Sequence, residues 1–227
     1  MAEIYLMMNK PAGYVCSAAS DSHKTVYELL PPELQYLVKN AKRGHRLHTI
    51  GRLDAATTGL LLFTTDGMFS HKIASGASDS APAALELVPV APDPAPAVPV
   101  PALAVPEPVE GPCKNPLITK TYLANLKHPV NNELQKEYIS KAAAGLILPP
   151  EKKAPEQKAA PAELSFINER TCQIKVCEGK FHEVRRIFRA LGNEVLELKR
   201  IAIGSLFLPD SLKLGEYTSF SPDQILF

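Results

Sequence analysis

The chain has 227 residues, of which 45% are hydrophobic, and its formal net charge is +1 at pH 7. This length is enough for one large domain or two small ones, and the apolar fraction is enough for a sizeable core. No apolar run is long enough to span a bilayer, and residues 1–9 lack the basic region of a secretory signal, so we expect a cytoplasmic protein without membrane association.

Apolar runs separated by turn residues predict short strands and helices in the first 75 residues. Strands are expected at 3–8, 14–17, 47–50 and 60–64, and helices at 25–30, from residue 31 or 32, and at 68–74. Thr25 and Glu28 have the spacing of a capping box, which would fix the start of the first helix. Pro31 or Pro32 suits the first turn of the second helix.

The composition changes abruptly between residues 77 and 117, where 11 of the 21 prolines lie. Proline donates no backbone hydrogen bond, so this segment is expected to be an extended and flexible insert. A shorter stretch at 149–161 has a similar composition and is interpreted as a linker. We therefore predict one domain over 1–227, interrupted by a Pro/Ala-rich insert at 77–117 and a short linker at 149–161.

The second half again alternates between strand and helix patterns. Strands are expected at 120–127, 164–167, 171–177, 195–203 and 217–220, and helices at 132–144 and 181–191. Gly192 is the expected stop of the last helix. Strands and helices do not follow a strict βαβ alternation, so the predicted class is α+β, with a mostly antiparallel mixed sheet and flanking helices.

The small net charge hides an uneven distribution. Residues 77–117 hold five acidic side chains and one basic side chain, a net of −4, which leaves +5 for the rest of the chain. Basic side chains cluster at 39–52 and again at 180–200. Each cluster alone could be an ordinary solvated face, but the two together favour a polyanionic partner. The four cysteines form no Cys-x-x-Cys pair, so no metal site is expected.

The surroundings of Asp54 make its carboxylate a candidate catalytic group. Asp54 lies in the run Gly51-Arg-Leu-Asp54, between two predicted strands and beside threonines. An aspartate in such a loop is often only a turn former. A short polar loop held by strands on both sides is, however, a common way to preorganise a catalytic group.

Several stretches resemble the RNA pseudouridine synthases, and in particular their RsuA-like branch, which acts on small-subunit ribosomal RNA. Four of them fall in the family's order, at 6–13, 51–67, 120–122 and 179–188, and the tail segments 198–204 and 214–217 also fit. Apart from the two interruptions, the resemblance covers nearly the whole chain. It implies the catalytic fold of that family, with a central cleft, and conversion of uridine to pseudouridine without a cofactor or metal.

The resemblance also implies site residues. Asp54 would be the nucleophile or proton acceptor near the sugar, Tyr122 would stack on the everted uracil, and Arg185 would pair with Asp54. Five further side chains are candidates for RNA contact: Lys10, Arg52, Lys120, Arg186 and Arg200. From the residues alone, Tyr122 could equally be a core aromatic, and the two arginines of the last predicted helix could lie on its solvated face.

Two departures from the family pattern qualify this interpretation. Many relatives carry a small RNA-binding domain ahead of the first catalytic strand, whereas this chain starts at that strand. Glu183 stands where the family has glutamine, and its charge is expected to disturb Arg185. The expected partner is ribosomal RNA or a ribosomal subunit precursor, bound by a monomer. The alternative is a catalytically inactive RNA-binding assembly factor, and the Pro-rich insert could dock a protein partner.

Overall fold

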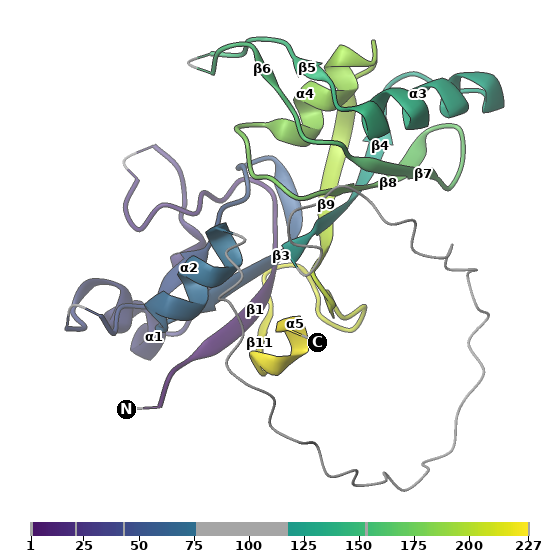
Figure 1. The fold of residues 1–227 in the computed structure, drawn as a ribbon. Helices are drawn as coiled ribbons and strands as arrows, with labels where there is room; N and C mark the ends of the chain where they lie inside the picture. The colour runs from purple at the N-terminus through teal and green to yellow at the C-terminus, as the bar shows by residue number, and fades with distance from the viewer. Residues whose placement is uncertain (1, 21, 43, 76–117, 153, 227) are drawn as a thin grey trace, which may run out of the picture.

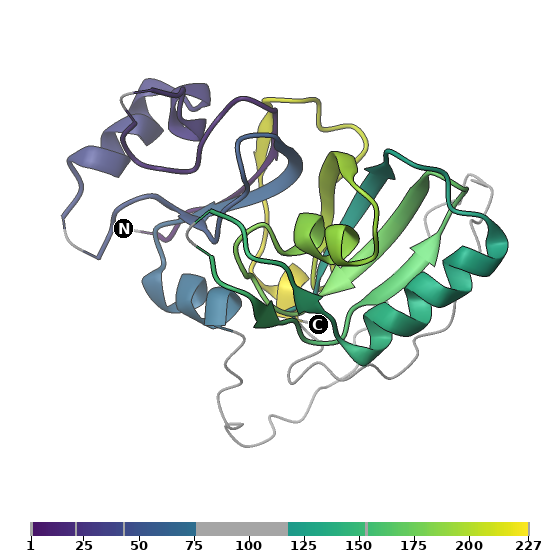
Figure 2. The same ribbon diagram turned by 90° about the horizontal axis from the view of Figure 1, so that it is seen from above.

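The structure is a computed structural model that describes residues 2–20, 22–42, 44–75, 118–152 and 154–226. A large mixed sheet runs through the molecule and helices flank it, as Figures 1 and 2 show. The predicted α+β class is therefore confirmed. The insert predicted at 77–117 lies outside the described residues.

The main sheet has nine strands, and all of its pairings except one are antiparallel. Its central order is β11 (Tyr217–Ser219), β1 (Tyr5–Lys10), β3 (Thr57–Thr64), β9 (Val195–Ile203), β4 (Lys120–Leu126), β8 (Thr171–Val176) and β7 (Glu163–Phe166). Two short strands extend it: β2 (His48–Ile50) pairs with β3, and β10 (Leu206–Phe207) pairs with β9. The helices are η1 (Val26–Leu29), α1 (Pro32–Lys39), α2 (Gly67–Ser75), α3 (Asn132–Ala144), α4 (Glu183–Ala190) and α5 (Asp223–Leu226).

The parallel pair β3–β9 joins the two halves of the molecule. Residues from the first third of the chain lie on one side of this pair, and β4, β7, β8, α3 and α4 lie on the other (Figure 2). Gly59 makes the close approach possible, because a Cβ at this position would lie 2.2 Å from the carbonyl oxygen of Arg200. Its φ of +100° is also unfavourable for any residue with a side chain.

Strand β3 is buried on both faces and so contributes to both hydrophobic clusters of the fold. Leu61 and Phe63 belong to the larger cluster, with residues of η1, β4, β8 and α4, whereas Leu60 and Leu62 belong to the smaller one, with residues of α2 and α5. Side chains alternate between the two faces of a strand, so an uninterrupted apolar run is what a doubly covered strand requires. This run places the Asp54 loop, which directly precedes β3, on a rigid support.

Most predicted elements are confirmed, with three local differences. The segment predicted as a helix at 25–30 is a 3-10 helix, and the backbone N–H of Thr25 donates to Glu28 at 2.7 Å, as the capping-box pattern indicated. The strand expected at 14–17 is reduced to a single bridge between Val15 and Thr25. Helix α4 begins at Glu183 and not at residue 181, because His182 has a left-handed backbone conformation with φ of 50°.

The linker interpretation of residues 149–161 is wrong for the described part of that segment. Strand β5 (Ile147–Leu148) pairs with β6 (Gln157–Lys158), and Glu151 forms a bridge with Ala154, so the segment is part of a hairpin. The side chain of Arg186 in α4 binds this hairpin. Its guanidinium donates to the carbonyl oxygens of Pro149 at 2.9 Å and Pro155 at 2.7 Å. These contacts join residues that are far apart in the sequence, so no local sequence pattern predicts them.

Candidate active site

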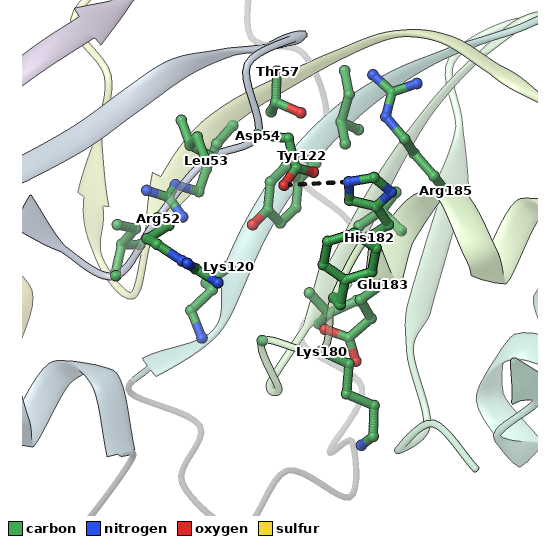
Figure 3. Close-up of a pocket in the computed structure, with 18 of the residues that line it drawn as sticks. Arg52, Leu53, Asp54, Thr57, Lys120, Tyr122, Lys180, His182, Glu183 and Arg185 are labelled. Atoms are coloured by element: carbon green, nitrogen blue, oxygen red, sulfur yellow. Dashed lines mark ion pairs between the residues drawn. The ribbon is translucent and has the colours of Figure 1, made fainter. Parts of the chain in front are cut away.

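A cavity of about 260 Å³ opens between the two halves of the molecule (Figure 3). Its wall combines the 50–57 loop of the first half with β4, the 179–185 segment and β9 of the second half. Three groups of predicted or charged residues line it: Asp54 and Tyr122; the cations Arg52, Lys120, Lys180, Arg185 and Arg200; and the pair His182 and Glu183. The motifs at 51–67, 120–122 and 179–188 therefore meet at one place.

The Asp54 loop is fixed by its backbone. The N–H of Thr57 donates to the Asp54 carbonyl at 3.0 Å, and the Lys10 ammonium donates to the same carbonyl at 3.1 Å and to that of Thr57 at 2.9 Å. The Asp54 carboxylate itself is 40% exposed on the cavity wall. Carbonyl contacts thus hold the main chain while the acidic group stays accessible.

Lys10 is consequently not an RNA contact. Its side chain is completely buried, and its ammonium also donates to the carbonyls of Pro11 and Ala55. Burial lowers the pKa of Lys10, and the nearby Asp54 charge acts in the opposite direction. The ammonium is a structural cation behind the loop and holds its main chain through these carbonyls.

Tyr122 has features of both roles that the sequence left open, a core aromatic and a site residue. It comes from β4, opposite Ile174 on β8 and Arg200 on β9, and its residue is only 9% exposed, as a core aromatic would be. It also lines the cavity, where Figure 3 shows its ring beside Asp54. The pairing of β4 with β9 shifts register between Thr121 and Tyr122, at the point where the ring enters the cavity wall.

Arg185 does not make the ion pair that the resemblance implies. Its guanidinium donates to the carbonyl of Val195 at 2.7 Å, and Figure 3 shows it turned away from the Asp54 carboxylate. Within the described ranges, the ion pair of Asp54 is with His182, whose Nε2 lies 3.6 Å from Oδ1. The Arg185 Nη2 atom is buried and has no hydrogen-bond partner among the described residues.

Sequence reasoning missed His182 as a site residue. Its Nδ1 lies 3.0 Å from Oε1 of Glu151, so the imidazole bridges two carboxylates. Phe181 stacks on the ring with centroids 3.8 Å apart. The available signal was a histidine inside the stretch 179–188, next to a predicted helix start, but Glu151 was hidden in the supposed linker.

The other candidates for RNA contact have different surroundings. Arg52 is exposed at the cavity, and Lys120 is partly buried there, with its ammonium donating to the carbonyl of Glu178 at 3.1 Å. Arg200 is 1% exposed, donates through Nε to Leu60 at 2.8 Å, and has an Nη2 without a partner in the described part of the chain. Arg186 is fully buried beneath the hairpin, so its prediction as an RNA contact is wrong.

Glu183 faces a different set of charges from the one expected. Figure 3 shows its carboxyl directed toward Lys180 and away from Arg185. The residue is 7% exposed. Burial, reinforced by the Glu178 charge, raises the pKa of Glu183 to about 7, although Lys180 and Lys120 act in the opposite direction. The charge expected to disturb Arg185 is therefore partly neutralised and points elsewhere.

Known proteins similar to this chain identify its family. The family model described as RNA pseudouridylate synthase matches residues 4–78. The ribosomal small subunit pseudouridine synthases A of Yersinia pestis and Escherichia coli strain K12 are each 32% identical to the chain over 97% of its length, which covers 71% and 72% of those proteins. A crystal structure of pseudouridylate synthase aligns with a TM-score of 0.67 at 30% identity, over 99% of this chain and 73% of that one.

The chain belongs to the RNA pseudouridine synthase family. It is an RNA pseudouridine synthase, and its sheet is the catalytic fold of that family. Nothing in these similarities favours the catalytically inactive assembly factor. No helix among the described residues of the synthase is long and apolar enough to cross a membrane.

Glu183 should make the stability of the synthase depend on pH. A carboxyl whose pKa rises from 4.5 to about 7 on folding stabilises the fold fully below about pH 4.5, and this contribution is lost as pH rises through about 7. Relative to the wild type, Glu183→Gln should therefore gain up to about 3 kcal/mol between pH 4.5 and pH 8, because each pKa unit corresponds to about 1.4 kcal/mol.

Denaturant unfolding of both proteins at several pH values between 4.5 and 8 would measure this difference. Glu169→Gln is the matched control, because Glu169 is exposed and lies outside the cavity. Parallel stability curves for Glu183→Gln and the wild type would contradict the prediction.

Proposed function

We propose that this synthase converts a uridine of small-subunit ribosomal RNA to pseudouridine in the cavity between its two halves. The observation that carries the proposal is that the Asp54 carboxylate and the Tyr122 ring line the same cavity, although their motifs lie far apart in the sequence. The choice of RNA rests on the relatives, which are named for the ribosomal small subunit.

The proposed chemistry assigns a different task to each of the two side chains. Asp54 acts as nucleophile or proton acceptor at the sugar while the bond from uracil N1 to the ribose breaks and a bond from the ribose to C5 forms. C5 then loses its proton and N1 gains one, so the product is an isomer of uridine. Tyr122 stacks on the everted base, and such stacking contributes about 1–3 kcal/mol per base. Because a base inside a duplex is out of reach, the target uridine must be flipped out or come from a loop.

The charges around the cavity support an RNA substrate. Arg52, Lys120 and Lys180 line it alongside Arg185 and Arg200, against the two carboxyl groups of Asp54 and Glu183. Arg52 is exposed at this wall, where its guanidinium can bind a phosphate or a uracil carbonyl oxygen. The net positive wall should make RNA binding weaken as salt rises.

The test is a pseudouridine map of ribosomal RNA after incubation with the purified synthase. Small-subunit RNA, offered both as free RNA and as a subunit precursor, should gain pseudouridine at one position, and large-subunit RNA should gain none. Conversion confined to large-subunit RNA would overturn the choice of substrate. Absence of conversion in both RNAs and in the precursor would overturn the proposal as a whole.

A further inference from the structure

We infer that His182 is a positioning residue, anchored by Glu151 of the β5–β6 hairpin, that aims the Asp54 carboxylate at the reacting nucleotide. The inference rests on the proposed role of Asp54. It assigns a task in the reaction to a segment, residues 147–158, none of whose described residues lines the cavity.

The two ring nitrogens of His182 each face a carboxylate. Nδ1 lies 3.0 Å from Oε1 of Glu151, and Nε2 lies 3.6 Å from Oδ1 of Asp54. A neutral imidazole has one N–H, so it would turn a lone pair toward one of the two carboxylates. Only the imidazolium donates toward both carboxylates, and its Nε2–H then faces Asp54.

The orientation of the imidazole is set from two further directions. The His182 backbone has φ of 50°, a conformation that few residues with side chains adopt, so the ring leaves the chain at a direction fixed by this turn. The Phe181 ring stacks on the imidazole, with 16° between the planes. The His182 side chain is also only 17% exposed. The backbone turn, the stacked ring and the low exposure together restrain the imidazole more than is expected for a histidine that is only a surface residue.

Glu151 is itself restrained. Nη1 of Arg189 in α4 lies 3.3 Å from its Oε2, and two of the carbonyls that Arg186 binds, those of Pro149 and Pro155, flank it in the hairpin. The Glu151 side chain is 17% exposed. Hydrogen bonding from His182 and the charges of His182 and Arg189 outweigh the effect of burial and lower the pKa of Glu151. Its carboxylate is thus held in place as an anionic anchor for Nδ1.

These contacts form a chain from the hairpin to the carboxylate proposed to react. A carboxylate that is 40% exposed has no other ion pair within the described residues to hold its orientation, so the His182 contact decides where its oxygens point. Since the 3.6 Å separation is longer than a hydrogen bond, the contact allows the carboxylate to move onto the sugar during the reaction. His182 need not touch the RNA for this task.

His182→Asn is the informative variant, because asparagine tolerates a positive φ and so preserves the backbone turn, yet it cannot reach both carboxylates. With the RNA that the wild-type protein converts, the single-turnover rate constant at saturating RNA should fall about 10²-fold, the effect expected of a misaimed reacting group. The dissociation constant for RNA should not change. His128→Asn is the control, since His128 is exposed and outside the cavity.

A double-mutant cycle tests the chain of contacts. Glu151→Gln should slow the wild-type protein roughly 10-fold but should have no further effect in the His182→Asn background, because residues acting in series are not additive. Additive effects of the two changes would overturn the inference. So would a wild-type rate constant for His182→Asn, or a rise in the RNA dissociation constant alone, which would make His182 an RNA contact.

Asp54→Asn, assayed in parallel, separates this inference from the proposed function. If Asp54→Asn is inactive while His182→Asn turns over at the wild-type rate, the positioning role fails and the site stands. If Asp54→Asn retains full activity, the site itself is wrong and the inference fails with it.

Discussion

Asp54→Asn is expected to lower the rate of pseudouridine formation by at least about 10³-fold, the scale typical for loss of a group that reacts directly. Asparagine has nearly the same volume, but its amide is a poor nucleophile and a poor proton acceptor. The contacts that fix the loop, from Thr57 and Lys10, use the backbone carbonyl of residue 54 and are unaffected. The loss should therefore appear in the chemical step and not in the fold.

The measurement is single-turnover conversion of the RNA, combined with a thermal unfolding curve. Asp210→Asn makes the same chemical change at an exposed position outside the cavity and should leave conversion at the wild-type rate. The assignment of Asp54 would be abandoned if its variant kept more than a tenth of the wild-type rate, or if both aspartate variants lost activity equally.

Arg186→Met is expected to destabilise the protein by about 3 kcal/mol or more, because buried carbonyls left without a donor each cost about 1–3 kcal/mol. The Arg186 side chain is completely buried, and besides Pro149 and Pro155 it donates to the carbonyls of Phe181 at 3.3 Å and Leu148 at 3.4 Å. Methionine fills much of the volume but donates nothing. The β5–β6 hairpin should loosen first, since most of these carbonyls belong to it.

Denaturant unfolding gives the global effect, and limited proteolysis between residues 149 and 158 gives the local one. Arg189→Met is the comparison, because Arg189 lies one turn later on the same helix, its side chain is 48% exposed, and its pair with Glu151 should contribute less than about 1 kcal/mol. Equal destabilisation by the two changes would show that Arg186 does not hold the hairpin in the way described.

Elements whose ends are set by neighbouring residues were predictable from the sequence. Helix α3 has the predicted bounds, because Asn131 caps it by accepting a hydrogen bond from the N–H of Leu134 at 2.9 Å, and Gly145, with φ of 79°, ends it. Strand β9 also has its predicted bounds. Such signals are local, so an apolar pattern with turn residues at its ends is enough to find the element.

Features that depend on distant partners were not predictable in the same way. Arg186 falls on the polar side of α4, where a sequence pattern indicates solvent, yet the hairpin covers that side. Lys10 was a candidate for RNA contact, but the Asp54 loop encloses it. The meeting of Asp54 with Tyr122 was expected only through the family resemblance, and the same resemblance gave the wrong ion-pair partner for Asp54.

The four carbonyls gathered by the Lys10 ammonium have a consequence for substrate binding. They belong to Pro11, Asp54, Ala55 and Thr57, so the loop that carries the carboxylate is ordered before any RNA arrives. Fixing one residue of a flexible loop costs about 1–2 kcal/mol of conformational entropy. This loss of entropy occurs during folding, so loop ordering does not reduce the free energy of RNA association. That free energy can instead drive the target uridine out of its stack.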